Sequence, residues 1–459
     1  MQVYLDYTNA LAETVGEQNG IPLQELQSFC VSAEPILEAL KVRMEAGELG
    51  FAELPLKPEL ANLATRCAST LREFSDTLLV IGIGGSALGA QALQNAMEVG
   101  RKGLKWGNVL VLDNVDPERT GELIDRVDPS RTVVNVVTKS GGTAETIANF
   151  MVVHKLFADK LPADEMKKRF VITTAAEKGD LGTIAKEEGW EILPIPDNVG
   201  GRFSVLSPVG LLPAAYLGVD IEELLGGARG ALQAVRQRKP SDNPALLSAA
   251  INVMLYKERK KTIRVFFPYA RALYGLALWC SQLWAESLGK KVDRNGNAVW
   301  CGQTPVVALG AVDQHSQVQL YMEGPSDKAI TFFEVTKFRR EIKIPQVFPE
   351  APSCAYLGGK SLNRLLAAEK TGTELALAGA GRPSTTFCLP TISPLIMGEL
   401  FLLLEYETAL AGELLQINAF DQPGVEQGKK NTYALMGRDG FEADRDTILE
   451  GQSSKRYKV

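Results

Sequence analysis

The sequence predicts an α/β fold with two units of mainly parallel sheet flanked by helices, and with helical segments at the N- and C-terminal ends. Short β-rich runs alternate with helical patterns between residues 77 and 195, and the alternation restarts near residue 262. Two glycine-rich turns directly follow two of the early runs. A chain of 459 residues has room for about two to three domains of the usual ~150 residues.

The N-terminal half is predicted to contain a helical arm and then the first α/β unit. Residues 8–49 have amphipathic helical spacing, so a helical arm is expected over residues 1–50. The first unit is assigned to residues 51–205 because strand patterns recur there between helical ones. Its strands are expected at Thr77–Ile83, Asn108–Leu112, Thr132–Val137, Arg169–Thr173 and Glu191–Ile195.

The second unit is assigned to residues 206–392, and a C-terminal helical segment with a tail to residues 393–459. Ser207 as cap and Pro208 in the first turn predict a helix over Val209–Leu217. The remaining expected elements are strands at Thr262–Phe267, Val306–Leu309, Ile330–Val335 and Thr385–Cys388, helices at Arg271–Ser287 and Ser393–Leu415, a shorter helical segment at 420–436, and a mobile tail at Gln452–Val459.

Composition excludes several classes of function. A net charge of −6 disfavours binding to nucleic acid or to anionic membranes, which reward a basic surface. Met1–Ala10 lacks the basic start and apolar core of a secretory signal, and no apolar stretch is long enough to span a bilayer. Six scattered cysteines without a CxxC pair, and two histidines, make a metal site hard to assemble. We therefore expect a cytoplasmic protein with no metal, no nucleic acid and no membrane partner.

The two glycine-rich turns predict a phosphate site. Gly82–Ser86 and Thr138–Thr143 each open a helix, so together they offer backbone N–H groups and hydroxyls to one anion. Thr138, Ser140, Thr143 and Thr146 line the second turn, and a hydroxyl can donate to a phosphate oxygen. We therefore expect a phosphorylated small molecule as ligand.

A dinucleotide site is the rival interpretation of the first turn. Gly82-x-Gly84-x-x-Ala87 satisfies a relaxed dinucleotide fingerprint. That fingerprint expects an acidic residue about 20 positions further on, whereas Asp113 lies about 30 positions on. A dinucleotide also leaves the second, hydroxyl-rich turn without a role, so the phosphate interpretation is preferred and an NAD-dependent dehydrogenase stays an alternative.

Two groups are candidates for acid–base chemistry. Arg202 follows Gly200-Gly201, where two residues without side chains let a guanidinium approach a ligand. Glu286 lies four residues after Gln282, on one face of a helix that Gly289 is expected to end. Its place in the last turn, among apolar neighbours, suits a general base. The plainer alternatives are an ordinary ion pair for Arg202 and a solvated helix end for Glu286.

His315, Gln422 and Lys429 complete the candidates. Asp313 is expected to cap a helix whose first turn contains His315, where the positive helix end favours a neutral imidazole. Gln422 and Lys429 are seven residues apart, so a helix starting at Pro423 would place them on one side. A structural histidine and a solvated lysine are the plainer alternatives.

Six stretches together resemble the glucose-6-phosphate isomerase (phosphoglucose isomerase) family, whose members contain two sugar-isomerase (SIS) domains. The stretches are Gly82–Gly89, Thr138–Thr146, Val199–Ser204, Gln282–Lys290, Gln314-His315 and Phe420–Lys429, and they occur in the family's order. The resemblance implies two SIS-type domains. It also implies reversible aldose–ketose isomerisation of glucose 6-phosphate and fructose 6-phosphate, a step of glycolysis and gluconeogenesis, through a cis-enediolate and without a cofactor.

The resemblance also implies a role for each residue. Glu286 would move the proton between C2 and C1, Arg202 would stabilise the intermediate, and His315 and Lys429 would open the sugar ring. The implied substrate contacts are Gly85, Ser86, Thr138, Lys139 through its backbone, Ser140, Thr143, Gln282 and Gln422. In this family the histidine comes from the neighbouring subunit, which implies a homodimer with shared active sites.

The sequence departs from the family pattern at Gly142, Ala144, Leu288 and Pro423. A non-catalytic sugar-phosphate sensor with SIS domains is the main alternative function, although a sensor has no need of Glu286, His315 and Lys429 together. Acceptance of mannose 6-phosphate also stays open, because discrimination at C2 depends on pocket geometry.

Overall fold

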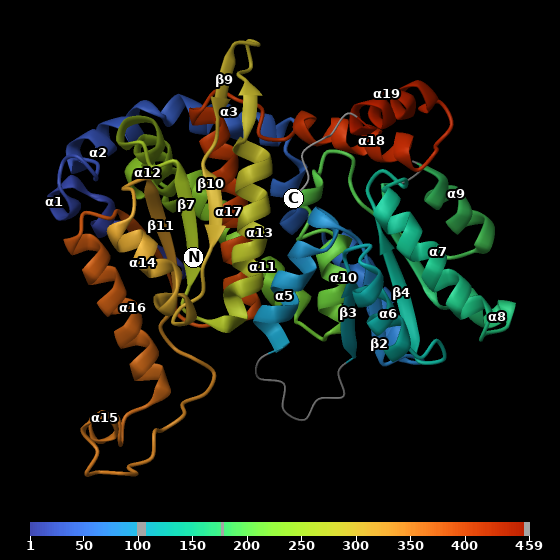
Figure 1. The fold of residues 1–459 in the computed structure, drawn as a ribbon, viewed down its shortest axis with the longest axis horizontal. Helices are drawn as coiled ribbons and strands as arrows, with labels where there is room; N and C mark the ends of the chain where they lie inside the picture. Colours follow the sequence, from blue (N-terminus) through green and yellow to red (C-terminus); the bar gives the residue numbers. More distant parts are fainter. Residues whose placement is uncertain (99–106, 176–178, 454–459) are drawn as a thin grey trace.

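The first sheet is fully parallel. The computed structural model describes residues 1–98, 107–175 and 179–453, and it contains two five-stranded sheets separated by a block of helices (Figure 1). In the first sheet the strand order is β3-β2-β4-β5-β6, and every neighbouring pair is parallel. These strands are β2 (Thr77–Ile81), β3 (Asn108–Leu112), β4 (Thr132–Val137), β5 (Phe170–Thr174) and β6 (Glu191–Pro194), which confirms the five predicted strands to within two residues.

Central strand β4 shows why this sheet is covered on both faces. All six of its residues are buried, and neighbouring valines face opposite sides. Val133 and Val137 belong to the main core, whereas Val134 and Val136 pack into a separate cluster with Phe150. Burial of both faces is typical of parallel sheets with helical crossovers. The crossover and flanking helices are α5 (Leu88–Glu98), α6 (Pro117–Arg126), α7 (Ala144–Ala158), α8 (Ala163–Met166) and α9 (Gly179–Glu188).

The second sheet has the order β1-β12-β11-β7-β10. Strands β7 (Ile263–Pro268), β10 (Thr304–Val307), β11 (Lys328–Val335) and β12 (Ser384–Leu389) are parallel, and all four were predicted. The edge strand β1 (Tyr4–Asp6) pairs antiparallel with β12 and was not predicted. Its three residues show no periodicity, and the tertiary structure holds them because Glu399 accepts hydrogen bonds from the N–H groups of Gln2 and Val3 at 2.7 and 2.9 Å.

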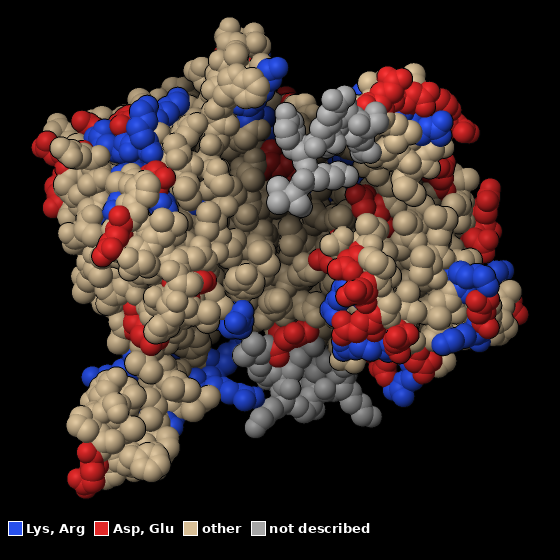
Figure 2. All heavy atoms as spheres, in the orientation of Figure 1, with Lys and Arg blue, Asp and Glu red and all other residues tan. Residues whose placement is uncertain are grey.

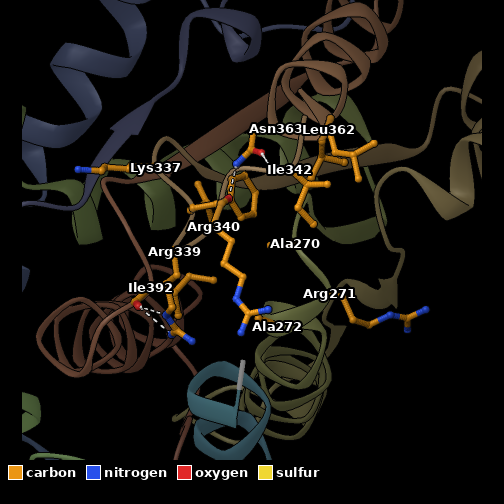
Figure 3. A pocket seen from close by; sticks show the side chains of 13 residues that line it. Ala270, Arg271, Ala272, Lys337, Arg339, Arg340, Ile342, Leu362, Asn363 and Ile392 are labelled. Atoms are coloured by element: carbon orange, nitrogen blue, oxygen red, sulfur yellow. Dashed lines mark hydrogen bonds between the residues drawn. The ribbon is translucent and has the colours of Figure 1, made fainter. Parts of the chain in front are cut away.

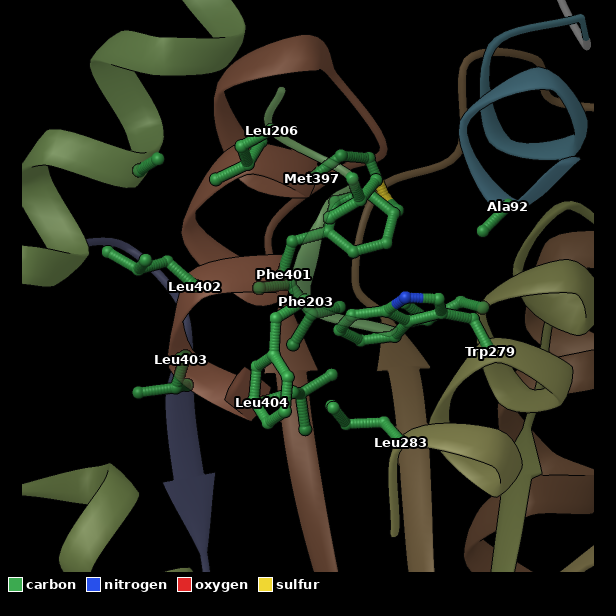
Figure 4. Packing of buried hydrophobic residues seen from close by; sticks show 14 of the residues in the cluster. Ala92, Phe203, Leu206, Trp279, Leu283, Met397, Phe401, Leu402, Leu403 and Leu404 are labelled. Carbon is green, nitrogen blue, oxygen red and sulfur yellow. The ribbon is translucent and has the colours of Figure 1, made fainter. Parts of the chain in front are cut away.

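The core lies between the sheets, in a block of long helices. Helix α17 (Pro394–Leu414) runs through it with 17 buried residues and packs against α11 (Ile221–Gln237), α12 (Pro244–Arg259) and α13 (Tyr274–Leu288). Trp279 and Phe401 meet edge to face, with ring centroids 4.9 Å apart (Figure 4). The expected caps are present, because Ser393 and Ser207 accept the backbone N–H groups of Ile396 and Val209.

The remaining helices complete the ends and edges of the molecule. The expected helical arm contains α1 (Ala12–Val15), α2 (Leu23–Ser32) and α3 (Glu34–Glu45), and the helix predicted after Ser207 is α10 (Pro208–Tyr216). The others are α4 (Pro58–Arg72), α14 (Gln317–Glu323), α15 (Pro352–Ala355), α16 (Leu362–Gly379), α18 (Glu426–Leu435) and α19 (Glu442–Ser453). Gln452 and Ser453, predicted as part of a mobile tail, belong to α19, and residues 454–459 lie outside the described part.

Two further features were not predicted. A hairpin of β8 (Lys290–Val292) and β9 (Ala298–Cys301) follows α13 directly, and a segment carrying α15 projects from the second sheet (Figure 1). On the face drawn in Figure 2, basic and acidic side chains are interspersed rather than gathered by sign. None of the described helices has both the length and the hydrophobicity needed to cross a membrane.

Candidate active site

The two glycine-rich turns lie at neighbouring strand ends. They follow β2 and β4, which are paired in the first sheet. The chain leaves β2 for β3 on one side and continues from β4 to β5 on the other, so the strand order reverses between them. Ligands of open α/β sheets bind at such a switch point, outside the carboxyl ends of the strands. Both predicted phosphate turns therefore open onto one place.

The first turn is packed against the loop that carries Arg202. A Cβ atom on Gly85 would lie 2.3 Å from the carbonyl carbon of Gly201, so only glycine permits this approach. Gly84 has a φ of 57°, and a Cβ there would lie 3.0 Å from Nε2 of Gln282. Ser86 ends the short 3-10 turn Gly84–Ser86 and is partly exposed. The glycines thus bring this turn close to Gln282 and to the Gly201-Arg202 backbone.

The second turn supplies hydroxyl groups and is tied to the same loop. The hydroxyls of Thr138 and Thr143 are 3.0 Å apart, and Ser140 is exposed. The ammonium group of Lys139 donates to the carbonyl oxygens of Asp197 and Val199, both at 2.8 Å. This lysine side chain therefore fastens the turn to the segment that leads to Gly200-Gly201-Arg202.

Polar groups at the start of α7 lack hydrogen-bond partners among the described residues. Thr143 is its N-cap residue but makes no side-chain cap hydrogen bond. The hydroxyl of Thr146, in the first turn, is buried and has no hydrogen-bond partner among the described residues. An anion at this helix end would meet unused N–H groups and a favourable helix dipole.

Arg202 is the most connected side chain of the site. It is 3% exposed, and its guanidinium donates to the hydroxyl of Ser287 at 2.7 Å and to Glu286 Oε1 at 3.1 Å. It also donates to the Gln422 side-chain oxygen at 3.1 Å and to the Ala419 carbonyl at 2.6 Å. Burial lowers the pKa of Arg202, while the charge of Glu286 opposes that shift. Segments distant in sequence thus converge on one buried cation.

Glu286 is held from two sides. Its Oε1 receives the Arg202 hydrogen bond, and its Oε2 receives one from Nε2 of Gln282 at 3.0 Å. The Glu286 side chain retains 26% exposure, so one edge of the carboxylate can be reached. Oε1 of Gln282 is buried and has no partner among the described residues. The arrangement offers a carboxylate, a cation and a free acceptor beside the first turn.

Lys290 was part of a matched sequence stretch but was given no role by sequence reasoning. It is 7% exposed, and its ammonium group donates to the carbonyls of Glu286 at 2.8 Å and Asp421 at 2.7 Å. Burial, followed by the nearby Arg202 charge, lowers the pKa of Lys290. A buried lysine next to a matched glutamate was the available signal, but burial is a tertiary property.

His315 is not brought to this cluster within one chain. It ends the 3-10 turn Val312–His315 after β10. The side chain of its neighbour Gln314 donates to the Tyr269 hydroxyl at 2.8 Å, and Tyr269 lies just before α13 begins. Glu286 is in the last turn of that helix, and 15 residues of α helix span about 22 Å. His315 and Glu286 therefore lie near opposite ends of α13.

The predicted capping role of Asp313 was wrong. Asp313 lies inside the 3-10 turn, and Ser316 precedes α14. Its carboxylate instead closes the turn by accepting hydrogen bonds from the N–H of Leu309 at 2.7 Å and the hydroxyl of Ser316 at 2.5 Å. The short side chain satisfies local donors of the turn, which compete with a helix cap.

The single helix expected to carry Gln422 and Lys429 was also wrong. Pro423 starts a 3-10 turn, Pro423–Val425, and α18 begins at Glu426. Gln422 contacts Arg202, whereas the ammonium group of Lys429 is exposed and pairs with Glu426 at 2.8 Å. The structure therefore brings Gln422 into the cluster but leaves Lys429 on α18, outside these contacts.

Comparisons with known proteins show what the chain as a whole is similar to. The family model described as phosphoglucose isomerase matches residues 67–443. Glucose-6-phosphate isomerase from Carboxydothermus hydrogenoformans is 46% identical, with 92% of each chain covered. Glucose-6-phosphate isomerase from Rubrobacter xylanophilus is 42% identical, with 96% of this chain and 99% of the relative covered.

Two solved structures share the fold. A hypothetical protein from Thermus thermophilus superposes with a TM-score of 0.84 at 38% identity, covering 95% of this chain and all of that one. A glucose-6-phosphate isomerase from Chlamydia trachomatis superposes with a TM-score of 0.83 at 23% identity, covering 99% of this chain and 92% of that one. The family match, the identities and the shared fold together place the sequence: this chain belongs to the phosphoglucose isomerase family.

Proposed function

We propose that this protein interconverts glucose 6-phosphate and fructose 6-phosphate, a reaction of glycolysis and gluconeogenesis. The observation that carries the proposal is the contact of Glu286 with Arg202 at 3.1 Å, beside two turns suited to a phosphate. Isomerisation next to a carbonyl needs a carboxylate near the C1 and C2 hydrogens and a cation near the oxygen that gains charge. Family membership supplies the reaction class.

The phosphate group is assigned to the two turns. Gly85 and Ser86 from the first turn, and Thr138, Lys139 backbone, Ser140 and Thr143 from the second, are the proposed donors. The free N–H groups at the start of α7 and its dipole add to the attraction for an anion. Binding energy gained at this remote phosphate holds the reacting carbons against Glu286.

Glu286 is the proposed base. Its carboxylate takes the proton from C2 of the open-chain aldose, and the C–H electron pair becomes the double bond of a cis-enediolate, with negative charge on the oxygen at C1. Arg202 stabilises that charge. The proton of the C2 hydroxyl passes to the C1 oxygen, and the carboxylic acid returns its proton to C1. The product has a hydroxyl at C1 and the carbonyl at C2, and the reverse direction uses the same groups. Gln282 and Gln422 are proposed to bind sugar hydroxyls.

Ring opening is assigned to His315 and Lys429, with His315 supplied by a second copy of the chain. Its placement near the opposite end of α13 from Glu286 supports this assignment, because one chain alone leaves the two residues far apart. The active protein is accordingly proposed to be a homodimer in the cytoplasm, with each site shared between subunits.

The decisive experiment is turnover of fructose 6-phosphate by purified protein treated with EDTA. Formation of glucose 6-phosphate is measured through a coupled dehydrogenase. Mannose 6-phosphate is assayed in parallel as a substrate, to determine whether the protein discriminates between the two configurations at C2. Rapid turnover supports the proposed isomerase without a metal. Absence of turnover by folded dimer would reject it in favour of a binding protein for sugar phosphates.

A further inference from the structure

A cavity lies at the carboxyl ends of the strands of the second sheet, in the position that the two glycine-rich turns occupy in the first sheet. Its volume is about 460 Å³, and it is lined by the loops after β7, β11 and β12 and by the start of α16 (Figure 3). The chain leaves β7 for β10 on one side, whereas β11 leads to β12 on the other. The switch point of this sheet therefore lies between β7 and β11, where α/β sheets bind ligands.

The cavity is positively charged. Four of its lining residues are Arg271, Lys337, Arg339 and Arg340, and no aspartate or glutamate is among the described residues that line it. Arg340 reaches across the pocket toward Ala272, whereas Lys337 and Arg271 extend outward to either side (Figure 3). Arg339 is already engaged with the carbonyls of Ile392 and Ala96, at 2.8 and 2.7 Å.

Arg340 is an exposed residue that lines the cavity from the loop after β11. Within the described chain no ion pair or hydrogen bond is recorded for its guanidinium, although its carbonyl accepts from Asn363 at 2.8 Å. The turn Arg271–Leu273 leads into α13, and its cap residue Ala270 has no side-chain acceptor. The first N–H groups of a helix have no partner inside it. A cation and a positive helix end therefore share the cavity, which favours an anion between them.

The rest of the wall is apolar. It is formed by Val335, Phe338, Ile342, Leu362, Leu366 and Ile392. A free inorganic anion would gain nothing from these side chains, whereas an anion attached to an apolar or aromatic body would bury that body against them. The volume lies within the range of pockets that hold small molecules, roughly 300–1,000 Å³.

We propose that this cavity binds a phosphate monoester that carries an apolar or aromatic body. Arg340 and the N–H groups of Arg271 and Ala272 contact the phosphate, and the apolar wall contacts the body. Within one chain the cavity is separate from Glu286, because the cavity lies at the first turn of α13 and Glu286 in the last. The proposal does not depend on the isomerase assignment.

Equilibrium binding of adenosine 5′-monophosphate to the full chain tests this site. The titration is done with an equilibrated mixture of fructose and glucose 6-phosphates at saturation, so that the first-sheet turns are occupied. We expect one nucleotide per chain, at least about tenfold weaker binding of adenosine, and at least about tenfold weaker nucleotide binding by Arg340→Gln, as for loss of a charge-assisted hydrogen bond.

Arg364→Gln is the matched control. Arg364 is an exposed arginine on α16, two residues beyond Leu362, and does not line the cavity. Both variants should retain isomerase turnover, which shows that they fold. Equal weakening by the two substitutions, or binding that the hexose phosphates abolish, would overturn the proposal. So would absence of nucleotide binding, including absence because a second copy covers the cavity.

Discussion

Arg202 determines the electrostatics of the candidate site. Its guanidinium is buried, and the single carboxylate that its recorded bonds reach is that of Glu286. Removing one partner of a buried pair leaves an uncompensated charge, which costs more than the pair contributes. The contact between Arg202 and Glu286 therefore satisfies both groups.

Replacing Glu286 by glutamine should abolish proton transfer while preserving the packing. Glutamine keeps the shape and can still contact Gln282, but it cannot accept a proton from carbon. We expect kcat for fructose 6-phosphate to fall by about 10²–10⁴-fold, the usual contribution of a general base. Steady-state kinetics and exchange of the C1 and C2 hydrogens with deuterated solvent measure the loss.

The matched control is Glu426→Gln, which removes an exposed carboxylate that pairs with Lys429. It should leave proton exchange at carbon unaffected. Wild-type exchange rates in a folded Glu286→Gln protein would disprove the assignment of the base.

Helix α13 and the hairpin after it form the element that places the proposed base, Glu286. Gln282 and Glu286 share one face of the helix. Lys290, the first residue of β8, follows the helix after Gly289. The Lys290 ammonium group ties the Glu286 carbonyl to the Asp421 carbonyl and carboxylate. This connection joins the end of α13 to the segment that carries Gln422.

Lys290→Met should disturb the alignment of the site without unfolding the chain. The apolar stem is preserved, but the carbonyls of Glu286 and Asp421 lose their shared donor. We expect kcat to fall by about 10- to 100-fold, since misplacement by about 1 Å is costly to catalysis. Hydrogen exchange should become faster at residues 419–422, a change that is measured by mass spectrometry.

Lys291→Met is the control for this element. Lys291 is the adjacent residue, is exposed, and lies over the ring of Trp300. It should keep wild-type kinetics and exchange. If Lys290→Met matches Lys291→Met in both measurements, Lys290 has no positioning role.

At the scale of the whole molecule, two sheets carry different parts of the proposed chemistry. The first sheet carries the turns proposed to bind phosphate. Helix α13, between the sheets, carries Glu286 and Ser287, which contact Arg202. The turn after β10 carries His315. The separation of His315 from Glu286 within one chain leads to a test of subunit sharing.

Glu286→Gln and His315→Ala proteins, each inactive alone, should restore activity when their subunits exchange. One site of each mixed dimer then combines an intact Glu286 with an intact His315. Random exchange of equal amounts should yield about a quarter of wild-type activity, because half of the dimers are mixed and each has one complete site. Native mass spectrometry verifies the exchange, and activity that stays at the parental level afterwards would exclude shared sites.

Glu405 in α17 should make global stability depend on pH. It is fully buried, both carboxylate oxygens have no partner among the described residues, and burial raises its pKa well above the ordinary value. The folded state holds this proton to a higher pH than the unfolded state. The contribution of Glu405 to stability is therefore greatest below the ordinary glutamate pKa of about 4.5 and falls as pH rises toward the folded-state pKa.

Glu405→Gln should remove the part of the loss of stability with rising pH that is due to Glu405. Thermal unfolding followed from pH 5 to pH 8 should give a flatter curve for the variant, with Tm raised by about 1–3 °C at pH 8. Glu341→Gln, at an exposed position, serves as control and should follow the wild type. Parallel curves for wild type and Glu405→Gln would show that Glu405 does not titrate in this range.

Local sequence rules were sufficient for most of the elements. Strands such as β4 can be predicted from sequence because both of their faces are buried, so that nearly every position is apolar or small. The start of α17 can be predicted because Ser393 is a suitable N-cap and a proline follows it in the first turn. Strand β1 and the hairpin β8–β9 escaped prediction because they are short and, for β1, held by a distant partner, Glu399. The Asp313 turn escaped because local hydrogen bonds compete with a helix cap.

The sequence by itself determined the two sheets, the two glycine-rich turns and the family, since these depend on periodicity, on glycine and on the order of motifs along the chain. Only the tertiary structure decided that Arg202 is a buried hub, that Lys290 joins α13 to the segment with Gln422, and that His315 lies away from Glu286. The physical reason is that burial and ion pairing depend on which distant segments are packed together, and no local pattern of residues encodes that distance.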